Sequence, residues 1–333
     1  AIAADGGLVV LSAAARDEIF DRVINHTGII EADSLVEKEG RIVLSGGATG
    51  VVRVDGGLTA DGRDGVDAGA IEVKGRDVEL GDKAWLSAKG KGKNSDGGEI
   101  RVLADRNGFV DGQAVIDVSG GYVSGNGGAA EISAKENLVV DGVTVNAGAV
   151  EGAAGTALFD PADLTISSNV FSNGGNLSYQ ADNSITVLAN VIISTRICAA
   201  GADHETAAST GNSGSIAMDA PLITIDSGAK LLAQGTDGFQ GGDVTLTADK
   251  EALTVTPFVN YNEADAKITI NDAVIKGDDI SITATADAGR TFSDGDDPLE
   301  WAIGLLNVGG GPASTFGGGI AVANSDARVE VNS

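Results

Sequence analysis

A repeat of 29 to 30 residues constrains this chain more than any other feature of its sequence. Between Gly69 and Ala149 the chain passes three times through one pattern, in repeats that begin at Gly69, Gly98 and Gly128. Each repeat holds three short apolar segments that alternate with period two, followed by a polar, glycine-rich loop. Such alternation is typical of strands, and the spacing is typical of stacked repeats. The sequence therefore predicts an all-β fold, a right-handed parallel β-helix (solenoid) with three short strands per coil.

Stacking satisfies the backbone hydrogen bonds that such short segments cannot make alone. Coils about 4.8 Å apart let each strand pair with its counterparts above and below. One side chain in two then points inward, where burial contributes about 1.5–3 kcal/mol. We expect glycines at the corners to adopt positive φ. The expected inward side chains are Ile71, Val73, Val78, Leu80, Ile100 and Val102, and the expected outward ones are Glu72, Glu79, Glu99 and Arg101.

The repeat continues outside this stretch, with one long interruption. From Gly175 to Gly214 the interval is 39 residues, and the excess is the polar loop 199–213. Loops longer than their counterparts often carry function on a solenoid, although a neutral insertion is the alternative. We expect regular coils over 1–166 and coils with longer loops over 167–333, which makes about eleven coils and a rod about 50 Å long.

Three other segments depart from the strand pattern. Residues 13–24 have helix-forming composition and helical apolar spacing, so we expect a short amphipathic helix there, with an irregular insertion as the alternative. Residues 265–272 match residues 326–333 position by position. The chain would then end inside a repeat, as a fragment of a longer protein able to associate end to end through its uncovered coil. Residues 301–319 are a second candidate excursion from the stack.

The charge of the chain bears on its partners. A formal net charge of −26 makes nucleic acid an improbable partner, because phosphate binding needs clustered Lys and Arg. No apolar run is long enough to span a membrane, and residues 1–5 lack the features of a signal peptide. We therefore expect that an export signal was removed or that the chain is an internal piece. The single cysteine, Cys198, is expected to be a small buried hydrophobe.

Motifs for catalysis or metal binding are missing from the sequence. His26 and His204 stand far apart and outside any ligand-spaced motif, and Cys198 has no identifiable base. We expect no catalytic, cofactor-binding or metal site, and no enzyme activity. Acidic stretches at 277–279 and 294–297 could offer calcium ligands, but a solvated loop is the simpler interpretation. Triplets that fit N-glycosylation occur at 25–27 and 176–178, a pattern that often arises by chance.

An enzymatic alternative stays open at this point. β-Helices often carry paired carboxylates and a basic residue on one exterior sheet, and such sites are scattered in sequence. A polysaccharide lyase or hydrolase is therefore the second hypothesis, although no cluster of Arg, Lys or His stands out among the carboxylates.

Residues 6–17, 28–35 and 40–47 carry a resemblance to a known family. These runs resemble the shaft regions of filamentous-haemagglutinin-type large exoproteins, adhesins of the two-partner secretion family, and residues 159–166 are similar to another element of that group. The resemblance implies a secreted, rod-like bacterial protein that acts in adhesion or aggregation and is exported by an outer-membrane secretion partner. The family's secretion domain, with its Asn-Pro-Asn motifs, has no counterpart in these residues.

These observations favour a structural and adhesive role. We expect the shaft of a bacterial surface adhesin or biofilm-matrix protein, extracellular or at the cell surface, that projects or forms a binding surface for host or bacterial cells or for polysaccharide. We expect no cofactor. The loops at 199–213 and 301–319 are the first places to look for recognition.

Overall fold

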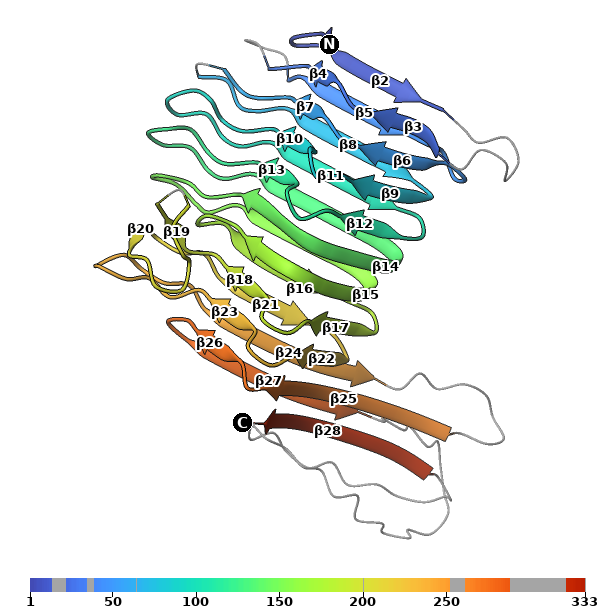
Figure 1. Ribbon diagram of the computed structural model, residues 1–333, viewed down its shortest axis with the longest axis vertical. Helices are drawn as coiled ribbons and strands as arrows, with labels where there is room; N and C mark the ends of the chain where they lie inside the picture. Colours follow the sequence, from blue (N-terminus) through green and yellow to red (C-terminus); the bar gives the residue numbers. More distant parts are fainter. Residues whose placement is uncertain are drawn as a thin grey trace, which may run out of the picture.

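The strands of this protein stack into one elongated body. The computed structural model describes residues 1–13, 22–34, 39–63, 65–199, 201–251, 261–287 and 322–332. Strands follow one another along the long axis from the N-terminus to the last strand (Figure 1), and 26 of them belong to one sheet. The described residues include no helix. Accordingly, none of them lies in a helix long and apolar enough to cross a membrane.

Parallel pairing joins these strands into three series, because each strand pairs with strands about one repeat away in the chain. The first series is β2 (Leu8–Ser12), β5 (Arg41–Ser45), β8 (Ala70–Gly75), β11 (Glu99–Ala104), β14 (Ala129–Asn146), β15 (Thr156–Phe171), β16 (Asn176–Gln180), β21 (Ile216–Asp219), β24 (Val244–Glu251) and β27 (Ile280–Asp287). The second is β3 (Arg22–His26), β6 (Val51–Val54), β9 (Asp77–Leu80), β12 (Gly108–Val110), β14, β15, β17 (Ser184–Val187), β22 (Leu222–Ile225), β25 (Tyr261–Asn271) and β28 (Val322–Asn332). The third is β1 (Ile2–Ala3), β4 (Ile29–Glu31), β7 (Gly57–Thr59), β10 (Trp85–Ser87), β13 (Val115–Asp117), β14, β15, β18 (Ile192–Ser194), β23 (Lys230–Leu232) and β26 (Val274–Lys276).

The large parallel sheet confirms the all-β part of the prediction and is consistent with a β-helix. Register follows the sequence repeat: Ile71 pairs with Ile42 on one side and with Ile100 on the other. The matching segments at 265–271 and 326–332 also lie side by side, with Asp265 opposite Asp326.

The predicted inward side chains form the core. All six of them are buried with at most 3% of their surface exposed, whereas Glu72, Glu79, Glu99 and Arg101 lie outside the core. Because equivalent residues stack, the core is a set of aliphatic columns that run along the body, and burial of each side chain stabilises the repeats next to it as well as its own.

The glycine anchors stack on one another, and the positive φ expected of corner glycines, which Gly65 and Gly142 show, does not explain them. None of Gly40, Gly69, Gly98 and Gly128 has a positive φ. Instead, a Cβ added to Gly69 would lie 1.9 Å from the carbonyl oxygen of Gly40, and one added to Gly128 would lie 2.1 Å from that of Gly98. Glycine is needed at these anchors because the backbones of successive repeats approach too closely for a side chain.

Two aromatic rings stack inside the core. Phe159 and Tyr179 pair in register, with ring centroids 5.0 Å apart, and both are fully buried. No described group hydrogen-bonds the Tyr179 hydroxyl, and burial raises the pKa of this phenol, which therefore stays protonated.

Removing this hydroxyl should stabilise the protein. We expect Tyr179→Phe to raise the free energy of unfolding by about 1 kcal/mol, because a buried polar group without a partner is costly. Urea unfolding measures the change. Tyr122→Phe is the matched control, since Tyr122 is 66% exposed and its hydroxyl stays in water in both states. A loss of stability in Tyr179→Phe would mean that the hydroxyl is hydrogen-bonded in the folded protein.

The helix expected over 13–24 is not present in its described part. Residues 22–24 begin strand β3, and Ile24 is buried in the core. Pairing with β6 explains this outcome, because tertiary hydrogen bonds to a neighbouring repeat override local helix propensity. Residues 14–21 lie outside the described residues.

Candidate functional site

The long interruption predicted from the sequence forms a small hairpin at the side of the stack. We call residues 195–213 the insertion; residue 200 is not among those described. Its strands β19 (Ile197–Cys198) and β20 (Ser209–Gly211) are antiparallel, unlike the other strand pairs described. Figure 1 shows β19 and β20 on the edge of the stack where the polar loops of the preceding repeats also lie.

A buried arginine holds the insertion in place. Arg196 is only 1% exposed, and its Nη1 donates to the carbonyl oxygens of His204 and Glu205, the latter at 3.3 Å. Its Nη2 donates to the carbonyl oxygen of Ala207 at 2.5 Å and to Thr236 Oγ1 at 3.3 Å. Among the described residues no carboxylate forms an ion pair with Arg196, so carbonyl dipoles of the insertion solvate its charge.

A hollow of 560 Å³, which we call the histidine hollow, lies on one side of the insertion. The His204 ring stacks on Phe171 with centroids 4.1 Å apart, and His204 Nδ1 lies 3.1 Å from Ser194 Oγ. Partial burial, followed by the positive charge of Arg196, lowers the pKa of His204. The ring is therefore neutral at neutral pH and contributes packing rather than charge.

Cys198 and His204 both line the histidine hollow, an association that no sequence motif predicts. Cys198 is partly exposed, so the expectation that it is a buried hydrophobe is wrong. Partial burial raises the pKa of the Cys198 thiol, and Arg196 only partly offsets this effect. A thiol with a raised pKa is a poor nucleophile, so this arrangement does not favour cysteine catalysis.

A second hollow of 550 Å³, the aromatic hollow, lies on the other side of the insertion. Tyr122 and Phe239 stand at its edges, 66% and 40% exposed. Asn173 and Ile197 line both hollows, so the two hollows adjoin each other. The residues that line the aromatic hollow are Ser119, Gly120, Gly121, Tyr122, Asn146, Gly148, Ala149, Val150, Asn173, Ile197, Thr210, Gly211, Asn212 and Phe239.

A third hollow of 470 Å³, the acidic hollow, lies beside the first series of strands. Asp105, Glu131, Asp160 and Asp182 line it together with two lysines, and Lys135 Nζ lies 2.5 Å from Asp105 Oδ1. Partial burial raises the pKa of Asp160, and the negative charges of Asp182 and Glu131 raise it further. A carboxyl with a raised pKa is the kind of group that can serve as a general acid.

The shifted pKa of Asp160 predicts a pH-dependent effect on stability. Since the folded pKa lies above the unfolded value, the charged form destabilises the fold once the pH rises through the folded pKa. Asp160→Asn should therefore raise the free energy of unfolding at pH 7, by at most about 1 kcal/mol because solvent screens this surface group. Below pH 3.8, the ordinary pKa of an aspartate, the variant and the parent should unfold alike. Thermal unfolding at pH 3 and pH 7 tests this, and a difference at pH 3 only would contradict it.

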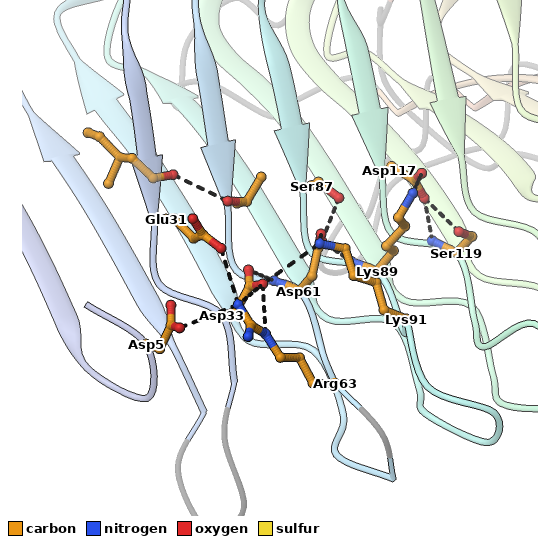
Figure 2. Close-up of polar contacts among 12 residues, drawn as sticks. Asp5, Glu31, Asp33, Asp61, Arg63, Ser87, Lys89, Lys91, Asp117 and Ser119 are labelled. Atoms are coloured by element: carbon orange, nitrogen blue, oxygen red, sulfur yellow. Dashed lines mark hydrogen bonds and ion pairs between the residues drawn. The ribbon is translucent and has the colours of Figure 1, made fainter. Parts of the chain in front are cut away.

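Two buried carboxylates are the centre of a polar group of residues near the N-terminal end of the stack (Figure 2). Asp33 and Asp61 follow β4 and β7 at equivalent positions and are almost fully buried. Asp33 Oδ1 accepts a hydrogen bond from the backbone N–H of Asp61 at 3.0 Å, and Asp61 Oδ1 accepts one from that of Lys89 at the same distance. Each carboxylate thus binds the backbone of the next repeat.

Two cations neutralise these carboxylates. Arg63 donates to Asp33 Oδ2 from Nε and Nη2 at 3.2 and 3.1 Å, and Lys91 Nζ lies 2.7 Å from Asp61 Oδ2. The hydrogen bond to Asp33 raises the pKa of Arg63. Burial lowers that of Lys91, but the hydrogen bond to Asp61 and its charge outweigh this and leave it raised. Since Asp33 and Asp61 are both bonded to backbone and to cations of neighbouring repeats, this group helps to fix the register of the stack.

The remaining residues that the sequence singled out have structural roles. His26 is buried in β3, with Nε2 3.2 Å from the carbonyl oxygen of Gly57. Asp278 Oδ2 accepts a hydrogen bond from the backbone N–H of Gly241 at 3.1 Å, and the backbone N–H of Asp279 donates to Asp243 Oδ1 at 3.3 Å. No cluster of metal-ligating side chains occurs among the residues that the structure describes. The stretches 294–297 and 301–319 lie outside the described residues.

The two glycosylation triplets lie in different surroundings. Asn25 is exposed in β3, whereas Asn176 Oδ1 accepts a hydrogen bond from the backbone N–H of Ser215 at 2.9 Å. The Asn176 amide therefore has a structural role between two repeats.

Sequence reasoning located the insertion but missed Arg196, Tyr122 and Phe239. Arg196 carries a recognisable signal, because it is a charged residue in strand-forming sequence directly before the polar loop 199–213. Tyr122 and Phe239 also carry one, since aromatic residues make up only 4% of the chain and these two stand in glycine-rich loops.

Comparisons with protein-family models, with curated proteins and with solved structures find no match to this chain.

Proposed function

We propose that this chain is a stiff, adhesive segment of a secreted bacterial surface protein of the filamentous-haemagglutinin type. Its fold is a right-handed parallel β-helix with three short strands per coil, and its place is outside the cell or on the cell surface. The observation that carries the proposal is the parallel register maintained from β2 to β27, because a stack in which every repeat is bonded to its neighbours is suited to act as a rod.

The role of the segment is to project or form a binding surface for host or bacterial cells or for polysaccharide. The hollows beside the insertion support this role, because loops that leave a rigid scaffold are where binding sites are usually found. The parent protein is exported through an outer-membrane secretion partner. The segment has no enzyme activity and needs no cofactor.

Binding and product analysis on the same samples test this function. The purified chain is incubated with a panel of neutral and anionic polysaccharides and with whole bacterial cells. Saturable binding without cleavage would support an adhesive segment. Absence of both binding and cleavage would indicate that the chain is only a spacer, and the adhesive part of the proposal would fail.

The acidic hollow favours a second candidate function, a β-helix polysaccharide lyase or hydrolase. Asp160 has the raised pKa of a general acid, and lysines line the same hollow. If the chain cleaves a polymer and Asp160→Asn abolishes turnover without loss of folding, this function replaces the adhesive one.

A further inference from the structure

The aromatic hollow is assembled from loops of successive repeats. Tyr122 lies in the loop between β13 and β14, Val150 in the loop between β14 and β15, and Phe239 in the loop between β23 and β24. The insertion supplies Thr210 and Asn212 between them. At about 4.8 Å per repeat, four successive repeats make a surface about 14 Å long. The hollow is therefore elongated along the stack and suits an extended ligand.

Exposed apolar side chains line this surface. Tyr122, Val150 and Phe239 are 66%, 68% and 40% exposed. Large apolar groups gathered around a hollow indicate a binding surface, and aromatic rings offer flat faces that can cover the apolar C–H face of a sugar ring.

Amide groups supply hydrogen-bonding capacity in the same hollow. Asn173 Nδ2 donates to Asn146 Oδ1 at 2.6 Å, and Asn212 Oδ1 accepts from the backbone N–H of Gln240 at 3.0 Å. Within the described part of the chain, these bonds leave Asn146 Nδ2 and Asn212 Nδ2 as donors and Asn173 Oδ1 as an acceptor. Hydroxyl groups of a ligand can bind both kinds of group.

Charge is absent from the lining. None of the residues that line the aromatic hollow is Asp, Glu, Lys, Arg or His, although 70 of the 333 residues of the chain (48 acidic and 22 basic) are charged. An anionic polymer would find no cation to pair with here, and a cationic one would find no carboxylate. The lining is complementary to an uncharged ligand that offers hydroxyl groups and apolar faces.

We propose that the aromatic hollow is a binding site for a neutral polysaccharide, with Tyr122 and Phe239 stacking on sugar rings and the amides of Asn146, Asn173 and Asn212 bonding to sugar hydroxyls. This assignment rests on the proposed adhesive function and names its ligand class and its location.

Affinity electrophoresis and calorimetry with defined polymers test the assignment. Dextran, a soluble β-glucan and a galactomannan are the neutral probes, and alginate is the anionic one. We expect at least one neutral polymer to bind, and Tyr122→Ala and Phe239→Ala each to weaken that binding about tenfold. Phe109→Ala is the matched control, because Phe109 is 37% exposed in β12 and does not line the hollow. Its binding should equal that of the parent, and circular dichroism confirms that all three variants are folded.

The possible outcomes distinguish failure of the proposed site from failure of the proposed function. Neutral-polymer binding that survives both Tyr122→Ala and Phe239→Ala overturns the site. Binding of alginate alone, or of cells without any neutral polymer, overturns the ligand class and leaves the adhesive function standing. If neither polymers nor cells bind, the proposed function and this assignment fail together.

Discussion

Replacing Gly98 with alanine is expected to lower the free energy of unfolding by about 3 kcal/mol. The new Cβ would lie 2.0 Å from the carbonyl oxygen of Gly69 in the preceding repeat. Neither backbone can move alone, because Gly98 N–H donates to the carbonyl oxygen of Ala88 at 2.7 Å and the carbonyl oxygen of Gly69 accepts from Glu99 N–H at 3.0 Å. Relief of the clash therefore separates two repeats, and urea unfolding measures the cost.

Gly57→Ala is the matched control for this prediction. Gly57 also lies in the stack and has no positive φ, but a Cβ there would be 3.6 Å from Trp85 Cε3, an ordinary van der Waals contact. We expect little change or a small gain in stability, because alanine restricts the unfolded chain more than glycine does. Equal losses in the two variants would show that the Gly98 effect does not come from the close approach of two repeats.

The positions of the glycine anchors could be predicted from the sequence, but their purpose could not. Spacing alone placed Gly69, Gly98 and Gly128 at equivalent points, and alternation correctly assigned Ile71 and Ile100 to the core. The reason for glycine depends on the distance between a carbonyl oxygen and an absent Cβ in another repeat. Local propensity carries no information about that distance, so positive φ, which holds at glycines such as Gly65 and Gly142, does not explain the anchors.

The candidate site likewise has one part that the sequence predicts, the insertion, and one part that it does not, the aromatic hollow. The interval between Gly175 and Gly214 revealed the insertion, because it is a one-dimensional property of the chain. The aromatic hollow instead joins Tyr122 to Phe239, which are 117 positions apart in the numbering. Their proximity follows only once the register of the intervening repeats is known.

The hydrogen bonds of Arg196 predict that the insertion can be destabilised without destabilising the stack. We expect Arg196→Met to accelerate amide hydrogen exchange in residues 197–211 about 100-fold, which corresponds to a loss of about 3 kcal/mol in local stability. Methionine fills much of the space but donates no hydrogen bond, so the carbonyl groups of His204, Glu205 and Ala207 lose their partner. The stack itself should melt at the parent temperature, because its parallel pairings do not depend on this side chain.

Arg101→Met controls for the loss of an arginine as such. Arg101 lies in β11 with half of its side chain exposed, so its replacement should leave exchange in the insertion unchanged. Arg196→Lys is more informative, because lysine keeps the positive charge but lacks the planar fork that reaches several carbonyl groups at once. If Arg196→Lys behaves like Arg196→Met, the geometry of the hydrogen bonds holds the insertion; if it behaves like the parent, charge alone is sufficient.

Since Thr210 and Asn212 line the aromatic hollow, release of the insertion should also weaken polysaccharide binding without any change at Tyr122 or Phe239. Unchanged exchange in the insertion, or melting of the stack together with it, would contradict this account of how the rigid body positions its binding surface.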